Sequence, residues 1–128
     1  MYKFKLSIPV YDATITFIID DEIEKVVNKY VKRLKWDDNV LIGEDETIHG
    51  YAVDTPSNGY YIFYKKKSLT ANCIVHEISH LVDFILEFRG IELVGESRSY
   101  LMGHITDKFF DFIIKNDLLV NKWLKKQE

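Results

Sequence analysis

The segment from Thr70 to Gly90 is the part of the sequence that most restricts how this chain can fold. Its apolar residues recur at steps of three and four, a period that predicts an amphipathic helix over residues 71–88. Thr70 is a favourable first cap, because its hydroxyl can accept a hydrogen bond from an N–H of the first turn, and a glycine such as Gly90 is a common stop. A similar period predicts a second long helix over 96–114, and the tail is expected to add a short helix over 118–124.

Shorter segments before these helices alternate between apolar and polar residues, or are rich in β-branched and aromatic ones, which predicts strands. They are residues 3–8, 13–19, 49–54 and 60–64, with room for a short one at 40–42 in an acidic loop. Turns at 9–12 and 56–59 join the strands in pairs, and a helix over 23–36 separates the pairs. Asp21 and Glu24 have the spacing of a capping box for that helix.

The resulting order, ββ-α-ββ-α-α, predicts the α+β class, with a small antiparallel or mixed sheet packed on the last two helices. A length of 128 residues fits one domain over 1–128. The net charge of −3 gives no reason to expect a nucleic-acid surface, and Lys65 to Lys67 is expected to be a solvated loop. A single cysteine, no signal-peptide pattern and no long apolar stretch predict a cytoplasmic protein without a membrane anchor. The oligomeric state stays open.

The predicted helix over 71–88 carries the sequence VHEISH, in which His76 and His80 are one helical turn apart. Residues four apart lie on the same helix face, so both imidazoles can reach one metal ion at about 2.0–2.1 Å. Glu77 is offset by about 100° and can lie beside the metal as a base that takes a proton from water. The alternative is three polar side chains on an ordinary packed helix.

Glu96 is the candidate for a third ligand, because a catalytic zinc usually keeps three protein ligands and one open position. It opens the second long helix, sixteen residues after His80, which leaves enough chain for the first helix to end and the second to fold back on it. The alternative is an acid that simply suits the positive end of the helix dipole.

HEISH followed by a glutamate on a second helix resembles the gluzincin group of zincin metallopeptidases. The segment 75–106 also resembles small zincin-like proteins encoded by bacteriophages, in which E-x-x-x-Y-L-x-G-x-I-T follows the motif; it covers about a quarter of the chain. The resemblance implies a minimal zincin-like fold, zinc ligands at His76, His80 and Glu96, and Glu77 as the base.

The chain departs from the thermolysin type at Tyr100, where those enzymes have an Asp that orients the first His. Tyr100 could orient a ligand or donate a hydrogen bond to an oxyanion, or be a core tyrosine. The metzincin pattern is disfavoured, because Asp83 stands in place of its Gly and Leu86 in place of its last His.

Four further residues could each belong to the metal site or have a purely structural role. Asp83 could be the hydrogen-bond partner of a ligand histidine, a fourth ligand or a solvated acid. His104 could reach a metal or be an ordinary helix residue, and His49 is expected to be structural. Cys73 could bind a soft metal, but a buried cysteine near a helix start is more ordinary.

Strand 60–64 directly precedes the metal helix, so it is expected to be the sheet edge that binds an extended peptide, or a core strand packed by its aromatic residues. The leading hypothesis is therefore a zinc metallopeptidase with a peptide or protein substrate. A rival hypothesis is a catalytically inactive, zinc-stabilised protein that binds a host component. A third is a core held by packing alone, without metal.

Overall fold

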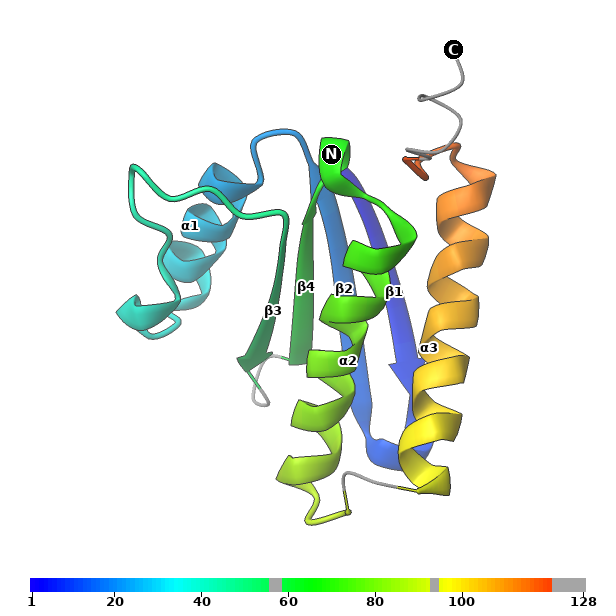
Figure 1. Cartoon of the computed structure of the whole chain (residues 1–128). Coiled ribbons are helices and arrows are strands. Elements are labelled where there is room, and N and C mark those ends of the chain that lie inside the picture. Colours follow the sequence, from blue (N-terminus) through cyan, green and yellow to red (C-terminus); the bar gives the residue numbers. More distant parts are fainter. Residues whose placement is uncertain (56–58, 93–94, 121–128) are drawn as a thin grey trace.

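The computed structural model describes residues 1–55, 59–92 and 95–120 and shows an α+β fold (Figure 1). The predicted fold class is confirmed. The described residues form four strands and three α-helices. The strands are β1 (Tyr2–Ile8), β2 (Ala13–Asp20), β3 (Gly50–Thr55) and β4 (Gly59–Lys65); the helices are α1 (Ile23–Leu34), α2 (Ala71–Phe88) and α3 (Glu96–Lys115). Short 3-10 turns lie at Pro9–Tyr11, Asp38–Val40 and Lys66–Ser68.

The four strands form one mixed sheet in the order β1-β2-β4-β3. β1 with β2 and β3 with β4 are antiparallel pairs, whereas β2 and β4 run parallel, with Ile15 opposite Tyr60. The prediction that strand 60–64 forms the sheet edge is therefore wrong, because β4 lies between β2 and β3. Its side chains are apolar on both faces, as expected for a strand covered on both sides.

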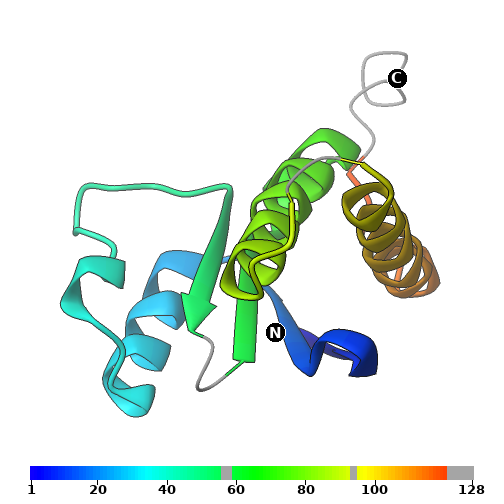
Figure 2. The same cartoon turned by 90° about the horizontal axis from the view of Figure 1, so that it is seen from below.

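Helices cover the two faces of the sheet, with α2 and α3 together on one side and α1 apart from them (Figure 2). A hydrophobic core lies on each face of the sheet, and alternate side chains of β4 contribute to the two cores. Tyr60, Ile62 and Tyr64 pack towards α2 and α3, whereas Phe63 packs towards α1. The buried Tyr64 hydroxyl donates to the Ile74 carbonyl at 2.8 Å and so ties the sheet to α2. Burial raises the pKa of Tyr64 well above its ordinary value, so this hydroxyl stays protonated.

The helix α3 packs on the sheet through residues four apart, which are Leu101, Ile105, Phe109 and Ile113. Phe109 stacks on Phe17 of β2 with ring centroids 4.1 Å apart. The predicted helices over 71–88 and 96–114 are thus confirmed, because the periodicity that predicted them is the periodicity with which they pack. The predicted helix over 118–124 falls mostly on residues 121–128, outside the described residues; residues 118–120 are not helical.

Two local predictions in the N-terminal half are wrong. The capping box of Asp21 and Glu24 does not form: Glu22 is the N-cap and makes no side-chain cap bond. The short strand at 40–42 is also absent from the described residues; the Asn28 side chain instead donates to the Ile42 carbonyl at 2.9 Å and accepts from its N–H at 2.8 Å. One amide side chain thereby takes the two backbone groups that a neighbouring strand would have bonded.

Candidate metal centre

The helix α2 presents its polar residues to solvent because its apolar residues hold it against the sheet. The Thr70 hydroxyl caps it by accepting from the Cys73 N–H at 3.2 Å, as predicted. The buried face consists of Ile74, Ile78, Leu81, Val82 and Ile85. His76 and His80 lie on the opposite, exposed side, and 64% of the His76 side chain is exposed.

The two imidazoles converge as the sequence spacing predicts. His76 Nε2 and His80 Nε2 are 3.2 Å apart, with the rings nearly perpendicular. Two nitrogens bound to one tetrahedral zinc at about 2.05 Å lie about 3.3 Å apart. The distance between the two Nε2 atoms therefore matches the separation of two ligand positions on such a metal.

Glu77 lies beside this pair but is turned towards the sheet. The residue is only 9% exposed, and its Oε2 lies 3.8 Å from His76 Nε2. Its neighbour on the sheet is Gly50, the first residue of β3: a Cβ added there would lie 2.6 Å from Glu77 Cγ. A glycine at this position is what lets the Glu77 side chain pass the backbone of β3. Sequence reasoning missed Gly50, although an isolated glycine in a strand is a recognised sign of close approach.

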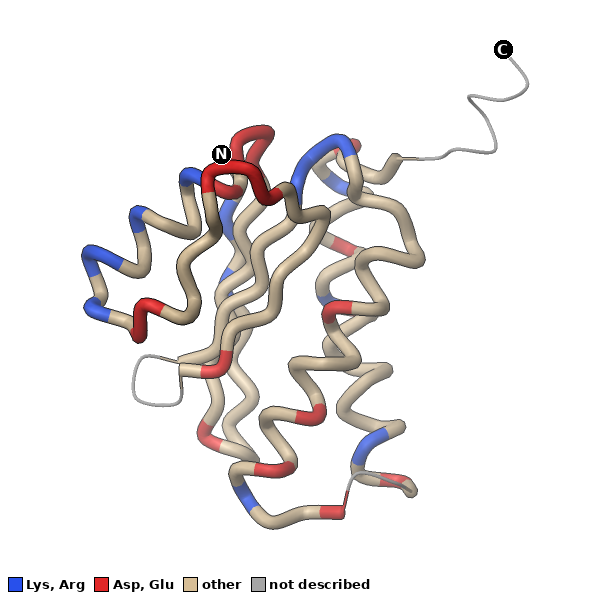
Figure 3. Tube along the Cα trace, turned by 60° about the vertical axis from the view of Figure 1, so that its left-hand side comes forward, with Lys and Arg blue, Asp and Glu red and all other residues tan. Residues whose placement is uncertain are grey.

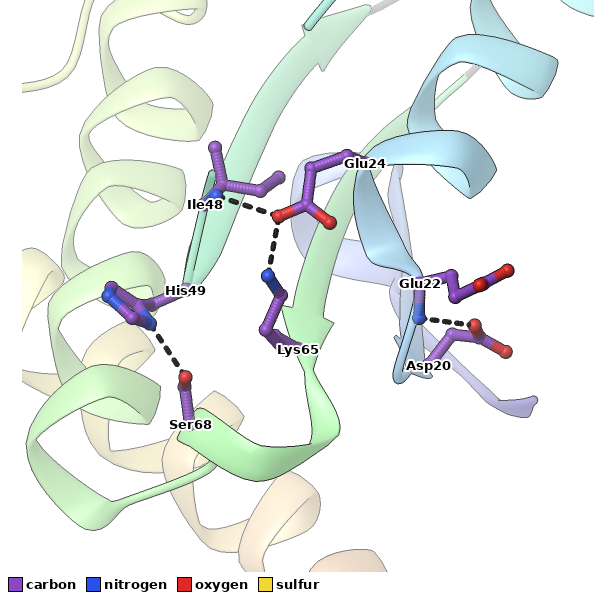
Figure 4. A network of polar contacts seen from close by, with 7 residues as sticks. All are labelled: Asp20, Glu22, Glu24, Ile48, His49, Lys65 and Ser68. Atoms are coloured by element: carbon purple, nitrogen blue, oxygen red, sulfur yellow. Dashed lines mark hydrogen bonds and ion pairs between the residues drawn. The ribbon is translucent and has the colours of Figure 1, made fainter. Parts of the chain in front are cut away.

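The backbone that leads into Gly50 is anchored by Glu24 of α1 (Figure 4). One Glu24 oxygen, Oε2, accepts from the Ile48 N–H at 2.9 Å and pairs with the Lys65 ammonium at 2.6 Å. Partial burial raises the pKa of Glu24, but hydrogen bonds from Lys65, from the Ile48 N–H and from its own N–H, together with the Lys65 charge, outweigh burial and hold the pKa below its ordinary 4.5. The ion pair with Lys65 and the hydrogen bond from the Ile48 N–H thus engage the carboxylate that a capping box would have used.

The open side of β3 carries backbone groups that no neighbouring strand uses within the described part of the chain. The Lys65 N–H donates to the His49 carbonyl at 2.9 Å. Alternate residues of an antiparallel strand bond to the same neighbour, so Gly50, Ala52 and Asp54 direct their N–H and C=O groups away from β4. This free edge starts at the residue that contacts Glu77.

The structure does not bring Glu96 to the histidine pair. Glu96 is the exposed first residue of α3. Among residues 1–55, 59–92 and 95–120, no group of three or more His, Cys, Asp or Glu side chains could hold a metal ion. Two predicted ligands, His76 and His80, are therefore assembled, and the third is not.

Tyr100 and Asp83 also have surroundings that the sequence did not indicate. Tyr100 is 76% exposed, so the expectation of a core tyrosine is wrong. Asp83 accepts a hydrogen bond from Arg98 Nε at 3.0 Å, and the same guanidinium donates to Ser79 Oγ at 2.7 Å. Asp83 thus joins α2 to α3 through Arg98. His104 is partly buried on α3, and Cys73 is partly buried on α2 near Gly50.

Comparisons with protein-family models, curated proteins and solved structures found no match for this chain. No helix among the described residues is long and apolar enough to span a membrane. The His76, Glu77 and His80 side chains and the strand edge beside them are the features of this chain that bear on its function.

Proposed function

We propose that this chain is a metal-dependent peptidase with a zincin-like fold, in which His76 and His80 bind zinc and Glu77 is the general base. The observation that carries this is the 3.2 Å separation of the two Nε2 atoms, with the Glu77 carboxylate 3.8 Å from one of them. Two histidines with an adjacent, sheltered carboxylate supply two ligands and a general base for metal-assisted hydrolysis.

Each side chain then has a distinct task. When bound, the zinc supplies Lewis acidity, which polarises a carbonyl and makes a water more acidic. Glu77 accepts the proton of the attacking water and returns it to the leaving amine. The contact with Gly50 restricts the Glu77 side chain, so its carboxylate stays beside His76. Tyr100 remains our prediction for a residue that assists the oxyanion.

A peptide is the substrate that suits the free edge of β3. The outward N–H and C=O groups of Gly50, Ala52 and Asp54 can pair with an extended peptide backbone. Because Gly50 contacts Glu77, a peptide added at this edge would run past the base and the histidine pair. The backbone pairing would hold the peptide without dictating its side chains.

The first test is the metal content of protein purified without a His tag. We expect about one zinc per chain in the wild type and a strong loss in His80→Ala. His104→Ala, which removes a histidine from α3, is the matched control and should keep its metal. An equal, low metal content in all three proteins would refute the metal site.

The second test separates metal binding from catalysis. Glu77→Gln keeps the size of the side chain and should retain zinc while it loses hydrolysis of a mixed peptide library. Because the structure does not place Glu96 beside the histidines, Glu96→Gln tests whether Glu96 becomes the third ligand when zinc binds, and a loss of zinc affinity in this variant would support that role. Wild-type protein that binds zinc but cleaves no peptide would instead be a metal-binding protein without turnover.

A further inference from the structure

A pocket of about 260 Å³ adjoins the histidine pair at the first turns of α2. Its lining includes His49 before β3, Lys67 and Ser68 from the turn after β4, and Asn72 and His76 from α2. His76 belongs to both the pocket and the metal pair. A substrate held at His76 and His80 would therefore place a neighbouring group in this space, which we call the Lys67 pocket.

The three consecutive lysines beside this pocket differ in what they contact. Lys65 pairs with Glu24 at 2.6 Å, and the Lys66 ammonium lies 5.7 Å from the centre of the Tyr2 ring. Lys67 forms no ion pair with any described carboxylate. Figure 3 shows this turn as a positively charged stretch directly before α2. Of the three ammonium groups, Lys67 is the one that borders this pocket, and no ion pair links it to a carboxylate of the described residues, although Asp21 and Asp117 line a neighbouring pocket with it.

The rest of the described lining provides neutral hydrogen-bonding groups. Asn72 supplies an amide and Ser68 a hydroxyl, which lies 2.6 Å from His49 Nδ1 (Figure 4). Among the described residues, no Asp or Glu lines the pocket. A cation together with amide, hydroxyl and imidazole groups suits a small anion with several acceptor oxygens. A carboxylate is the anion that a peptide substrate carries.

We propose that the Lys67 pocket binds a carboxylate of the substrate and so selects peptides with an acid next to the cleaved bond. This inference rests on the proposed peptidase function and adds the substrate class to it. The carboxylate has two sources, an Asp or Glu side chain or the C-terminus of the peptide. Both would place the same two oxygens beside Lys67.

Binding and cleavage are measured with three acetylated probe peptides that differ in where they carry a carboxylate. They are acetyl-Ala-Ala-Glu-Ala-Ala-amide, its Gln counterpart, and the Gln peptide with a free C-terminus in place of the amide. Binding is measured by NMR titration of zinc-loaded Glu77→Gln protein, which prevents turnover, and cleavage is measured with wild-type protein. We expect at least one carboxylate peptide to bind about tenfold more tightly than the Gln peptide, with shifts at Lys67 and Asn72.

The matched variants remove one positive charge each. Lys67→Gln should abolish the carboxylate preference, whereas Lys66→Gln should retain it. A preference for the Glu peptide identifies a side-chain acid, and a preference for the free C-terminus identifies a terminal carboxylate. Equal binding of all three peptides, or a preference that survives Lys67→Gln, overturns the inference even if hydrolysis is observed. A Lys67-dependent preference without hydrolysis would support the pocket while the peptidase proposal fails.

Discussion

The contact between Gly50 and Glu77 makes the sharpest prediction, because one added methyl group should disturb the base and leave the metal ligands in place. In Gly50→Ala the new Cβ would lie 2.6 Å from Glu77 Cγ, 3.2 Å from Glu77 Cδ and 3.3 Å from Cys73 Sγ. The first distance is far below van der Waals contact, so Glu77 must move or the start of β3 must separate from α2.

Two opposing terms set the size of the effect. Replacing a strand glycine by alanine stabilises by about 0.5–1 kcal/mol, because the unfolded chain loses freedom. Overpacking at a buried contact costs about 1–3 kcal/mol. We therefore expect Gly50→Ala to lower the free energy of unfolding by about 1–2 kcal/mol and the Tm by about 3–10 °C. Zinc content should stay the same, whereas peptide hydrolysis should fall because Glu77 is displaced.

Urea denaturation and calorimetry measure the stability change, and Gly103→Ala is the matched control. Nothing lies within 4 Å of a Cβ added at Gly103 of α3, so this variant should gain about 0.5–1 kcal/mol. In the background of Glu77→Ala, which lacks Cγ and Cδ, Gly50→Ala should lose most of its cost, giving a coupling of about 1–2 kcal/mol. A Gly50→Ala protein as stable as Gly103→Ala, with no coupling to Glu77, would refute the packing argument.

Three further substitutions test contacts that hold the site in place. Because the folded-state pKa of Glu24 is lowered, its pair with Lys65 stabilises above pH 4.5 and is lost as the pH falls through that lowered pKa. Glu24→Gln should therefore cost about 1–2 kcal/mol at neutral pH and much less near about pH 3, as urea denaturation at both pH values would show. Tyr64→Phe leaves the Ile74 carbonyl with its helical partner alone and should cost about 0.5–1.5 kcal/mol; a neutral effect would contradict the hydrogen bond. Arg89→Met removes donors to three backbone carbonyls and one hydroxyl, and thermal unfolding should show a loss of about 2–3 kcal/mol.

Much of the fold could be predicted from local patterns. The bounds of α2 follow from the Thr70 cap, the apolar period and Gly90, whose φ of +67° is the left-handed conformation expected after a helix. The convergence of His76 and His80 is equally local, since one turn of helix places residues four apart on the same face. Such features depend on neighbours along the chain, so the sequence contains all the information that they need.

Strand order could not be predicted in the same way. The apolar character of strand 60–64 suited both an edge beside the metal helix and a covered interior strand. Because β2 pairs with β4 in parallel, β4 is an interior strand and β3 forms the edge of the sheet. That pairing places Ile15 opposite Tyr60, although α1 and β3 separate the two strands in sequence. Its energy comes from the burial of apolar side chains on both faces of the sheet.

The sequence by itself therefore determined the helices, most strands and the paired histidines, because short-range periodicity and caps specify them. Only the tertiary structure decided which strand borders the site, that Gly50 accommodates Glu77, and that Glu24 bonds to Lys65 instead of capping its helix. It also left Glu96 exposed on α3, away from the histidines. These outcomes depend on the packing of segments distant in sequence, where burial and long-range pairing outweigh the local preference of each residue.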